Sequence, residues 1–374
     1  MKKTAHYPTM SIGALAVLAL LVVAGCATEQ PAAQKALAPY KFGAVLSLTG
    51  TNAFYGEFGK YGIDLAIEDL NNAGGINGRS VQVIYEDSAG DKGKAATATQ
   101  KLIGVDAVDA LFTITTPMGG AIAPIAEENK IPFIYASATN SFAEGKTYVF
   151  KDYPDASDQC ERLMRQAMKD HTKIALFGTN AEFTQLCKKG VERVGTLAVF
   201  ETYDPGESDF KTQFAKIKSS GSTALILSQF SNDCVNSFKQ LRELSLTTQL
   251  YAPFQAFGCG SPQNSKDYPA LLENAYGADL ATDDSDPEFR ALTQRLEARG
   301  WTTQFVGSAV MYDSVMEMAQ AFKGCADTLC VTNNLRNLNG YKGPSGKVSY
   351  NGKQIVTRDT MLTHFDAGAW TRVQ

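Results

Sequence analysis

Histidine is scarce in this 374-residue chain, which contains only three, and His6 lies close to the N-terminus. A Ser-His-Asp hydrolase needs a histidine that an acid holds beside a nucleophile, whereas His171 follows a predicted helix end, where we expect a solvated side chain. The sequence also lacks a G-x-S-x-G elbow, a P-loop and a G-x-G-x-x-G turn after its first predicted strand. The acidic segment 86–91 is typical of a polar turn. We therefore expect no catalytic residue, no cofactor and no metal site.

An excess of either charge is also missing, since 35 Lys and Arg against 39 Asp and Glu leave a formal net charge of -4. A protein that grips a phosphate backbone or an anionic membrane surface needs a clear basic excess. We therefore expect no nucleic-acid partner. Hydrophobic residues make up 44% of the chain, and its length is sufficient for two globular domains.

A long apolar run is absent except near the N-terminus. Lys2 and Lys3 precede an apolar segment over 12–23, which is too short to span a bilayer and fits a cleaved signal peptide over 1–25. The end of that segment, Ala24-Gly25-Cys26, resembles a lipobox, in which the cysteine becomes lipidated, although Val23 stands where leucine is commoner. A membrane anchor, or a signal with a chance cysteine, is the less favoured alternative. Segment 26–39 is small and polar, which predicts a flexible tether, so we expect a periplasmic or cell-surface protein held to the membrane by lipid alone.

Six cysteines remain if Cys26 carries lipid. None shows the C-x-x-C spacing of a structural zinc site, and an even number outside the cytoplasm favours disulfides over buried free thiols. Six cysteines allow 15 pairings, and locality along the chain selects three of them: Cys325–Cys330, and with less support Cys160–Cys187 and Cys234–Cys259.

Short apolar runs alternate with amphipathic segments along most of the chain. The strand–helix pattern extends from 42 to 135 and restarts from 157 to 244, with turn residues between the segments. Such alternation predicts an α/β fold with parallel sheets covered by helices on both faces. Two runs predict two doubly wound lobes, and ligands of such sheets bind at the carboxyl ends of the strands.

An ordered set of short segments resembles the type I periplasmic solute-binding proteins, in particular the branched-chain amino-acid (Leu/Ile/Val)-binding branch of ABC importers. The segments are SLTG at 47–50, YG at 55–56, INGR at 76–79, YEDSAGD at 85–91, APIAE at 123–127, ASAT at 136–139, DF at 209–210, LREL at 241–244 and YKGPSG at 341–346. The resemblance implies three crossings between the lobes, which we place near Asp155, Asp283 and Ser345. Lobe 1 is then 40–155 plus 284–345, and lobe 2 is 156–283 plus 346–374.

The same resemblance implies that lobe 1 holds a ligand carboxylate with hydroxyls and backbone N–H groups. The matching positions are Thr116, Ser137 and Thr139, with Tyr55 as an aromatic neighbour of the ligand. A carboxylate that leaves water must regain several hydrogen bonds, and the helix that begins near Pro117 would supply free N–H donors. Without the resemblance, turn-capping hydroxyls would be the simpler interpretation.

Lobe 2 departs from the amino-acid-binding pattern. Phe183 and Phe230 stand where the family commonly has tyrosine, and Phe254, followed by Gln255, stands where the family has the acid that pairs with the ligand ammonium. Since a buried ammonium without a counter-charge is costly, the departure favours a ligand without an α-amino group and leaves an amino acid as the alternative. Core filling is a competing interpretation for Phe183, and a small shift of the alignment would let Gln255, Asp233 or Glu182 reach an amine.

These patterns predict a monomeric solute-binding lipoprotein that closes at its hinge around a small carboxylate for an ABC importer permease. The expected ligand is a branched-chain or hydrophobic amino acid, or a related aliphatic or aromatic acid. The alternative is a non-transport lipoprotein that uses the same fold for protein interaction or sensing.

The lipid anchor gives a first test. We expect Cys26 to be the modified N-terminus of the mature protein, since two acyl-type chains hold a protein to a membrane far better than one. Mass spectrometry of protein extracted from membranes should show a lipid-modified mass that Cys26→Ser abolishes. An unmodified mature chain that starts at another residue would exclude the anchor.

Overall fold

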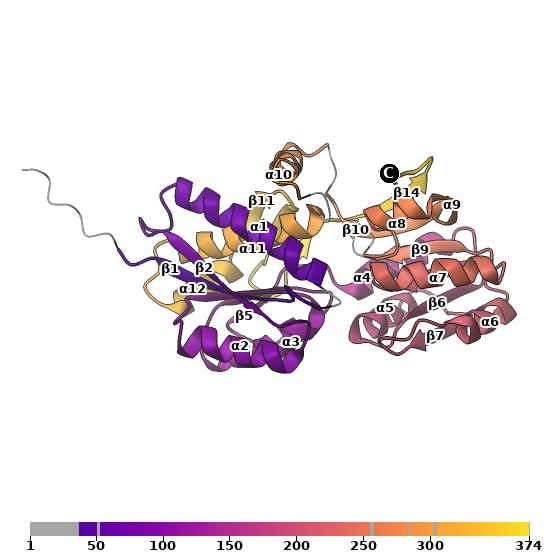
Figure 1. The fold of residues 1–374 in the computed structure, drawn as a ribbon, viewed down its shortest axis with the longest axis horizontal. Coiled ribbons are helices and arrows are strands. Elements are labelled where there is room, and N and C mark those ends of the chain that lie inside the picture. The colour runs from indigo at the N-terminus through magenta and orange to yellow at the C-terminus, as the bar shows by residue number, and fades with distance from the viewer. Residues whose placement is uncertain (1–36, 51–52, 255–257, 283–284, 302–304, 374) are drawn as a thin grey trace, which may run out of the picture. The chain divides into compact units, whose positions relative to one another are not determined.

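The computed structural model describes residues 37–373 except 51–52, 255–257, 283–284 and 302–304 (Figure 1). The predicted signal peptide, Cys26, most of the tether, Gln255 and Asp283 lie outside the described residues. Among the residues that are described, no helix combines the length and the apolar character that a membrane span requires.

Lobe 1 is built on a five-stranded parallel sheet of order β2-β1-β3-β4-β5. Its strands are β1 Tyr40–Leu46, β2 Val81–Asp87, β3 Ala110–Ile114, β4 Phe133–Ala136 and β5 Val149–Lys151. Its helices are α1 Ala53–Asn72, α2 Lys92–Gly104, α3 Thr116–Glu128, α10 Pro287–Glu297, α11 Phe305–Phe322 and α12 Thr328–Arg336. A small antiparallel sheet completes the lobe with β11 Asn339–Gly343, β12 Gly346–Ser349 and β13 Thr357–Arg358.

Lobe 2 is built on a seven-stranded sheet of order β15-β14-β10-β9-β8-β6-β7. Its strands are β6 Ile174–Thr179, β7 Val199–Tyr203, β8 Ala224–Ser228, β9 Gln249–Pro253, β10 Tyr276–Leu280, β14 Thr360–Asp366 and β15 Ala369–Arg372. Its helices are α4 Ala156–Ala167, α5 Glu182–Glu192, α6 Lys211–Ser220, α7 Ser231–Glu243, α8 Pro262–Asp267 and α9 Pro269–Leu272. The strands from β6 to β10 pair in parallel, whereas β14 and β15 add an antiparallel hairpin at one edge.

Alternation along each strand divides the core of each lobe between the two faces of its sheet. Phe112 of β3 packs into the cluster formed with α1 and α11, while its neighbour Leu111 packs into the cluster formed with α2 and α3. In lobe 2, the neighbouring residues Phe177 and Leu176 of β6 likewise belong to two different core clusters. Successive side chains of a strand point to opposite faces, so a continuous apolar strand buries both sides of a sheet covered by two helix layers (Figure 1).

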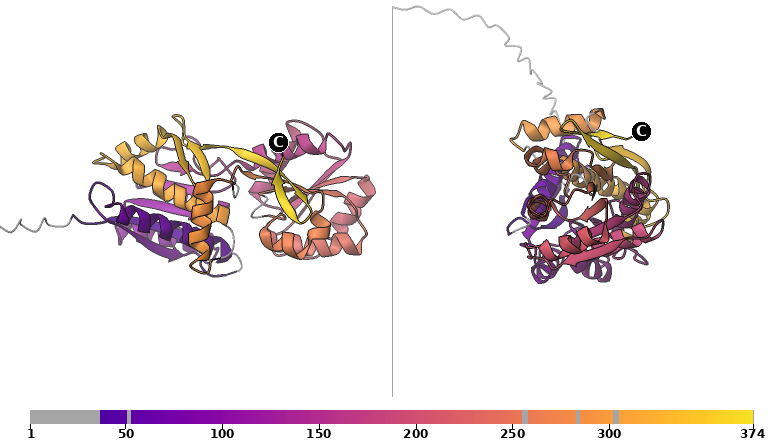
Figure 2. Two further views of the ribbon diagram at one scale, coloured as in Figure 1. Left: turned by 90° about the horizontal axis from the view of Figure 1, so that it is seen from above. Right: turned by 90° about the vertical axis from the view of Figure 1, so that its right-hand side faces the viewer.

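The chain crosses between the two sheets three times. The first crossing follows β5, and the second lies between β10 and α10. The third crossing differs, because it falls at Asp359, between β13 and β14, rather than near Ser345. Segment 346–358 stays with lobe 1, since β12 pairs with β11 and Val348 and Tyr350 join the lobe 1 core. Figure 2 shows the yellow C-terminal segment running from the small sheet to the seven-stranded sheet.

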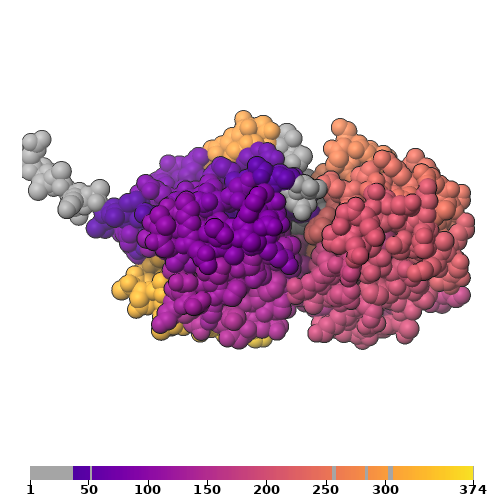
Figure 3. Space-filling model, turned by 60° about the horizontal axis from the view of Figure 1, so that its bottom comes forward, coloured from indigo at the N-terminus to yellow at the C-terminus, as the bar shows by residue number. Residues whose placement is uncertain are grey.

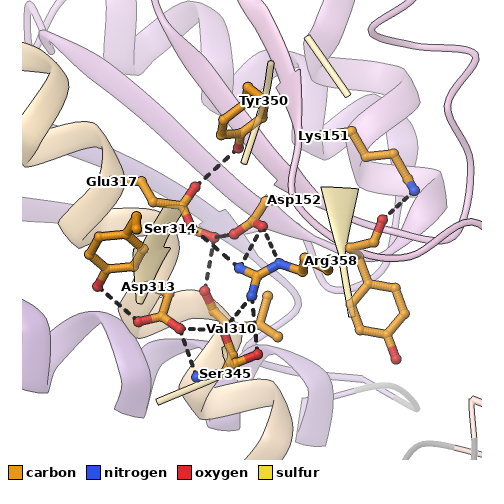
Figure 4. Close-up of polar contacts among 11 residues, drawn as sticks. Lys151, Asp152, Val310, Asp313, Ser314, Glu317, Ser345, Tyr350 and Arg358 are labelled. Atoms are coloured by element: carbon orange, nitrogen blue, oxygen red, sulfur yellow. Dashed lines mark hydrogen bonds and ion pairs between the residues drawn. The ribbon is translucent and has the colours of Figure 1, made fainter. Parts of the chain in front are cut away.

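A buried ionic cluster joins the first and third crossings (Figure 4). The Arg358 guanidinium, 1% exposed, lies 2.6 Å from a carboxylate oxygen of Asp152, which is fully buried. Arg358 Nη2 also lies 3.3 Å from Glu317 Oε1 on α11, and Arg358 Nη1 donates to Ser345 Oγ at 2.6 Å. Breaking a buried ion pair by removing one partner typically costs about 3–5 kcal/mol, so this cluster fixes where the two crossings leave lobe 1.

The cluster contains more acidic than basic side chains, and Asp313 is one of the acids whose pKa responds to this excess of negative charge. Its carboxylate accepts from the Ser345 N–H at 2.7 Å and from the Tyr341 hydroxyl at 3.0 Å. Burial raises the pKa of Asp313 to about 7, against the lowering effect of Arg358. Burial also raises the pKa of Glu317, which Asp152 raises further. The folded protein therefore retains a proton in this cluster that the unfolded chain releases at lower pH.

We expect Asp313 to make stability depend on pH. Below about pH 4 the carboxyl of Asp313 is protonated in both the folded protein and the unfolded chain. As the pH rises to about 7, only the unfolded chain releases this proton. The folded state is therefore stabilised by the retained proton at low pH, and this contribution to the free energy of unfolding is lost between about pH 4 and 7. The free energy of unfolding of the wild type, relative to Asp313→Asn, should fall by roughly 2–4 kcal/mol between pH 4 and 7. Denaturant unfolding at several pH values measures the difference.

Asp286→Asn is the matched control. Hydrogen bonds from the α10 N-terminus lower the pKa of Asp286 despite partial burial, so its contribution is complete above about pH 4 and the difference from wild type should stay flat from pH 4 to 7. A flat difference for Asp313→Asn as well would show that Asp313 does not hold the proton.

Candidate functional site

A cavity of about 70 Å³ lies where strand ends of the two lobes meet. A single buried water needs only about 10–15 Å³ of such space, so the cavity admits a small organic group. Figure 3 shows the boundary between the lobes from one side. The lining residues are Tyr55, Phe58, Ile114, Thr115, Thr116, Ala136, Ser137, Ala138, Tyr153, Phe183, Phe230, Phe254, Gly307 and Val310.

Three phenylalanines of lobe 2 form the apolar wall of the cavity, and we use that name for Phe183, Phe230 and Phe254. Phe183 is the second residue of α5, Phe230 stands at the N-cap position of α7 after β8, and Phe254 follows β9. The ring centroid of Phe183 lies 4.7 Å from that of Phe230 and 6.1 Å from that of Phe254. Tyr55 meets the wall from lobe 1, edge-on to Phe230 at 5.4 Å. Aromatic pairs at these separations pack favourably, so the wall is a continuous carbon surface.

The polar part of the cavity comes from lobe 1. Ser137 is 5% exposed and its hydroxyl has no hydrogen-bond partner among the described residues. Thr115 and Thr116 line the same cavity at the N-terminus of α3, where no side chain caps the helix. Thr115 has a φ of 87°, which is strained for a β-branched residue. Uncapped N–H groups beside an unpaired hydroxyl form an arrangement that suits an anion.

Tyr55 brings a second unpaired hydroxyl to the site. Its side chain is buried and its hydroxyl has no partner among the described residues. Burial, with smaller contributions from Asp233 and Tyr203, raises the pKa of Tyr55 well above its ordinary value. The hydroxyl therefore stays protonated and is available as a donor.

Two carboxylates that the sequence left open as amine partners are engaged elsewhere. Asp233 accepts a hydrogen bond from the Tyr203 hydroxyl at 2.7 Å. Glu182 is exposed and accepts from the hydroxyls of Thr139 and Ser141, each at 2.9 Å. Neither acid is among the lining residues, and the lining residues that the structure describes carry no charge.

Six of the eight residues expected at the ligand line this one cavity: Tyr55, Thr116, Ser137, Phe183, Phe230 and Phe254. Thr139 differs, because it is buried outside the lining and its hydroxyl donates to Glu182 across the lobes. Gln255 lies outside the described residues.

Sequence reasoning missed several lining residues, among them Phe58, Tyr153 and Val310. Phe58 lies three residues after Tyr55 on α1, and this helical spacing could have indicated it. Tyr153 lies in the first crossing, and Val310 lies on α11, which reaches the site only through the second crossing. Within the described residues, His, Cys, Asp and Glu side chains form no group of three or more that could hold a metal ion.

The structure pairs the six cysteines as Cys160–Cys187, Cys234–Cys259 and Cys325–Cys330, the pairs that locality had selected. The first joins α4 to α5, and the second joins α7 to the segment after β9. Both lie in lobe 2, within a few residues of the apolar wall.

Known proteins share both the sequence pattern and the fold. The family model described as periplasmic binding protein matches residues 39–369. The chain belongs to the periplasmic binding protein family. It is 24% identical over 353 residues to the leucine-, isoleucine-, valine-, threonine-, and alanine-binding protein of Pseudomonas aeruginosa, which covers 90% of this chain and 91% of that protein. The family resemblance found in the sequence is thereby confirmed.

Two solved structures show the fold of this periplasmic binding protein. The branched-chain amino acid transporter substrate binding protein LivJ from Streptococcus pneumoniae, in complex with isoleucine, superimposes with a TM-score of 0.81 at 21% identity, covering 90% of this chain and 99% of that one. An ABC transporter solute binding protein from R. palustris, in complex with 4-hydroxybenzoate, gives 0.76 at 18% identity, covering 90% and 96%. The predicted two-lobed type I fold is confirmed, and these relatives are transporter binding proteins rather than enzymes.

The unpaired hydroxyl of Ser137 gives a test that needs no ligand. A buried hydroxyl without a partner destabilises the folded state, so we expect Ser137→Ala to leave the free energy of unfolding unchanged or raise it by up to about 1 kcal/mol. Ser314→Ala is the matched control: the Ser314 hydroxyl donates to the buried Asp152 at 2.5 Å, so its loss should destabilise by about 1–3 kcal/mol. Equal losses in both variants would mean that Ser137 is paired in the folded protein.

Proposed function

We propose that this protein captures a small carboxylate with an apolar or aromatic tail, outside the cytoplasm, and delivers it to an ABC importer permease. Cys26 anchors it to the membrane by lipid, it acts as a monomer, and its lobes close on the ligand through the three crossings. Hinge closure around a ligand is an established motion of such two-domain proteins.

The observation that carries the proposal is the division of one cavity into two chemistries. Lobe 1 contributes the free hydroxyl of Ser137 and the uncapped N-terminus of α3, which carries Thr116. Lobe 2 contributes the apolar wall. Ligand pockets of this kind bury an apolar body and fix its orientation with a few placed polar groups. A carboxylate placed on the donors of lobe 1 puts its tail against the wall.

The positions of the charged side chains near the cavity support a ligand without an α-amino group. An ammonium ion placed against the wall would lie beside Phe254, where the resemblance implies an acid. Asp233 and Glu182 are both engaged by hydroxyl donors. A buried ammonium without a counter-charge costs several kcal/mol, whereas a keto acid or a benzoate-like acid carries no such charge. The ligands in the two structural neighbours, isoleucine and 4-hydroxybenzoate, are both carboxylates, with and without an amine.

A thermal-shift screen tests the carboxylate requirement. Benzoate and 4-methylpentanoate should raise the melting temperature, since a ligand at a hundred times its Kd stabilises the folded state by about 2.7 kcal/mol. The shape-matched benzyl alcohol and benzylamine should leave the melting temperature unchanged, since neither offers an anion to the α3 N-terminus. Ser137→Ala should reduce the benzoate shift.

Two results would count against the proposal. Equal shifts with benzoate and benzyl alcohol would show that the cavity recognises only apolar shape. No shift with any acid of a broad panel would instead favour the non-transport interaction module.

A further inference from the structure

The apolar wall is attached to α4, the helix that leaves the first crossing. Asp155 caps this helix, its carboxylate accepting from the Ser157 N–H at 2.8 Å. Two neighbouring residues of α4, Gln159 and Cys160, are both fully buried. Neither lines the cavity, yet each is bonded to a segment that carries a phenylalanine of the wall.

Gln159 holds the backbone of Phe254. Its side-chain oxygen accepts the Phe254 N–H at 2.8 Å, across 95 residues of sequence. Phe254 needs this support because its φ is 52°, a left-handed conformation that is rare outside glycine, asparagine and aspartate. The Gln159 side-chain nitrogen has no partner among the described residues. A buried amide with one group unpaired is costly, and the bond that its oxygen accepts from Phe254 offsets part of that cost.

Cys160 holds the helix of Phe183. Its disulfide to Cys187 joins α4 to α5, with a Cα–Cα distance of 5.1 Å. Cys187 follows Phe183 by four residues, so one helical turn separates the disulfide from the wall. Gly190 allows the close approach, since a Cβ there would collide with the Ser157 carbonyl. The two helices are therefore joined along the C-terminal half of α5, one turn away from Phe183.

We propose that α4 positions the apolar wall, with Gln159 fixing Phe254 and the Cys160–Cys187 disulfide fixing Phe183, so that Gln159 sets ligand affinity without touching the ligand. The inference rests on the proposed function for its effect on affinity, but the positioning itself is measurable without a ligand. Because α4 begins at a crossing, the same helix connects the hinge to the wall.

Gln159→Met removes the acceptor while keeping a side chain of similar length. We expect amide hydrogen exchange at Phe254 in the ligand-free protein to become roughly 3–10-fold faster, the range expected for one lost hydrogen bond. The Kd for benzoate should weaken by a similar factor. Gln159→Glu keeps an acceptor oxygen and should keep the Phe254 amide protected.

Two controls separate positioning from general loss of stability. Gln166 lies on the same helix and is buried, but its oxygen accepts from Lys169, so Gln166→Met should change neither quantity. Removing the disulfide in Cys160→Ala/Cys187→Ala should weaken benzoate binding, whereas Cys325→Ala/Cys330→Ala in lobe 1 should not. In a Phe254→Ala background, Gln159→Met should have no further effect on the Kd.

Unchanged exchange at Phe254 in Gln159→Met, or an equal change in Gln166→Met, would overturn the inference. Wild-type protein that fails to bind benzoate or any related acid would instead refute the proposed function, and the exchange measurements would still decide whether Gln159 positions Phe254.

Discussion

Arg358 and Asp152 form an ion pair with no more than 1% of either side chain exposed, and this pair joins two of the segments that connect the lobes. Asp152 stands directly after β5 and Arg358 ends β13, so the pair ties the first crossing to the third. A second link joins the first crossing to β10, because the Tyr153 hydroxyl donates to Asp279 at 2.9 Å. Charges so deeply buried persist only when paired, and burial raises the pKa values of Asp313 and Glu317 on α11, so the excess of acid is reduced by a retained proton. Two of the three crossings are thereby anchored on the lobe 1 side.

The cavity must also satisfy the rule that a buried charge needs a partner, but it does so without charged side chains in its described lining. The ionic cluster pairs its own charges, whereas the described lining of the cavity carries none and offers an unpaired Ser137 hydroxyl and the N-terminus of α3. A ligand anion can be stabilised there by neutral donors and the helix dipole. A ligand cation finds no charged side chain among the described lining residues, since Asp233, which accepts from Tyr203, is not one of them. The chemistry of the site is therefore asymmetric, which is the basis of the proposed preference for a carboxylate without an amine.

Local patterns predicted the elements well and long-range partners poorly. The strand at Ala110–Ile114 lies within the strand–helix run predicted over 42–135, because a short apolar run between turn residues admits little else. The third crossing, which the resemblance led us to place near Ser345, was misplaced, because the turn at Gly346 is a hairpin that returns to lobe 1. Arg358 could not be assigned, since its partner Asp152 lies 206 residues away.

Within the site, the resemblance identified the residues that follow strand ends, where the backbone alone determines which positions reach the cavity. The resemblance failed at Thr139. This residue lies only two positions after Ser137, yet its hydroxyl donates to Glu182 and does not line the cavity. Gln159 gave no signal at all, since a glutamine in an amphipathic helix usually faces solvent, and its bond to Phe254 exists only in the folded chain.

The most direct test of the account compares two ligands that differ only at the α-carbon. Leucine and 4-methyl-2-oxopentanoate share the carboxylate and the branched tail, and only leucine brings an ammonium to the apolar wall. Titration calorimetry on the ligand-free protein should give a Kd for the keto acid that is at least about 100-fold lower, since several kcal/mol of unpaired charge correspond to two or more decades. Leucine binding as tightly as the keto acid, or more tightly, would contradict the account and show that an acid reaches the amine in the closed protein.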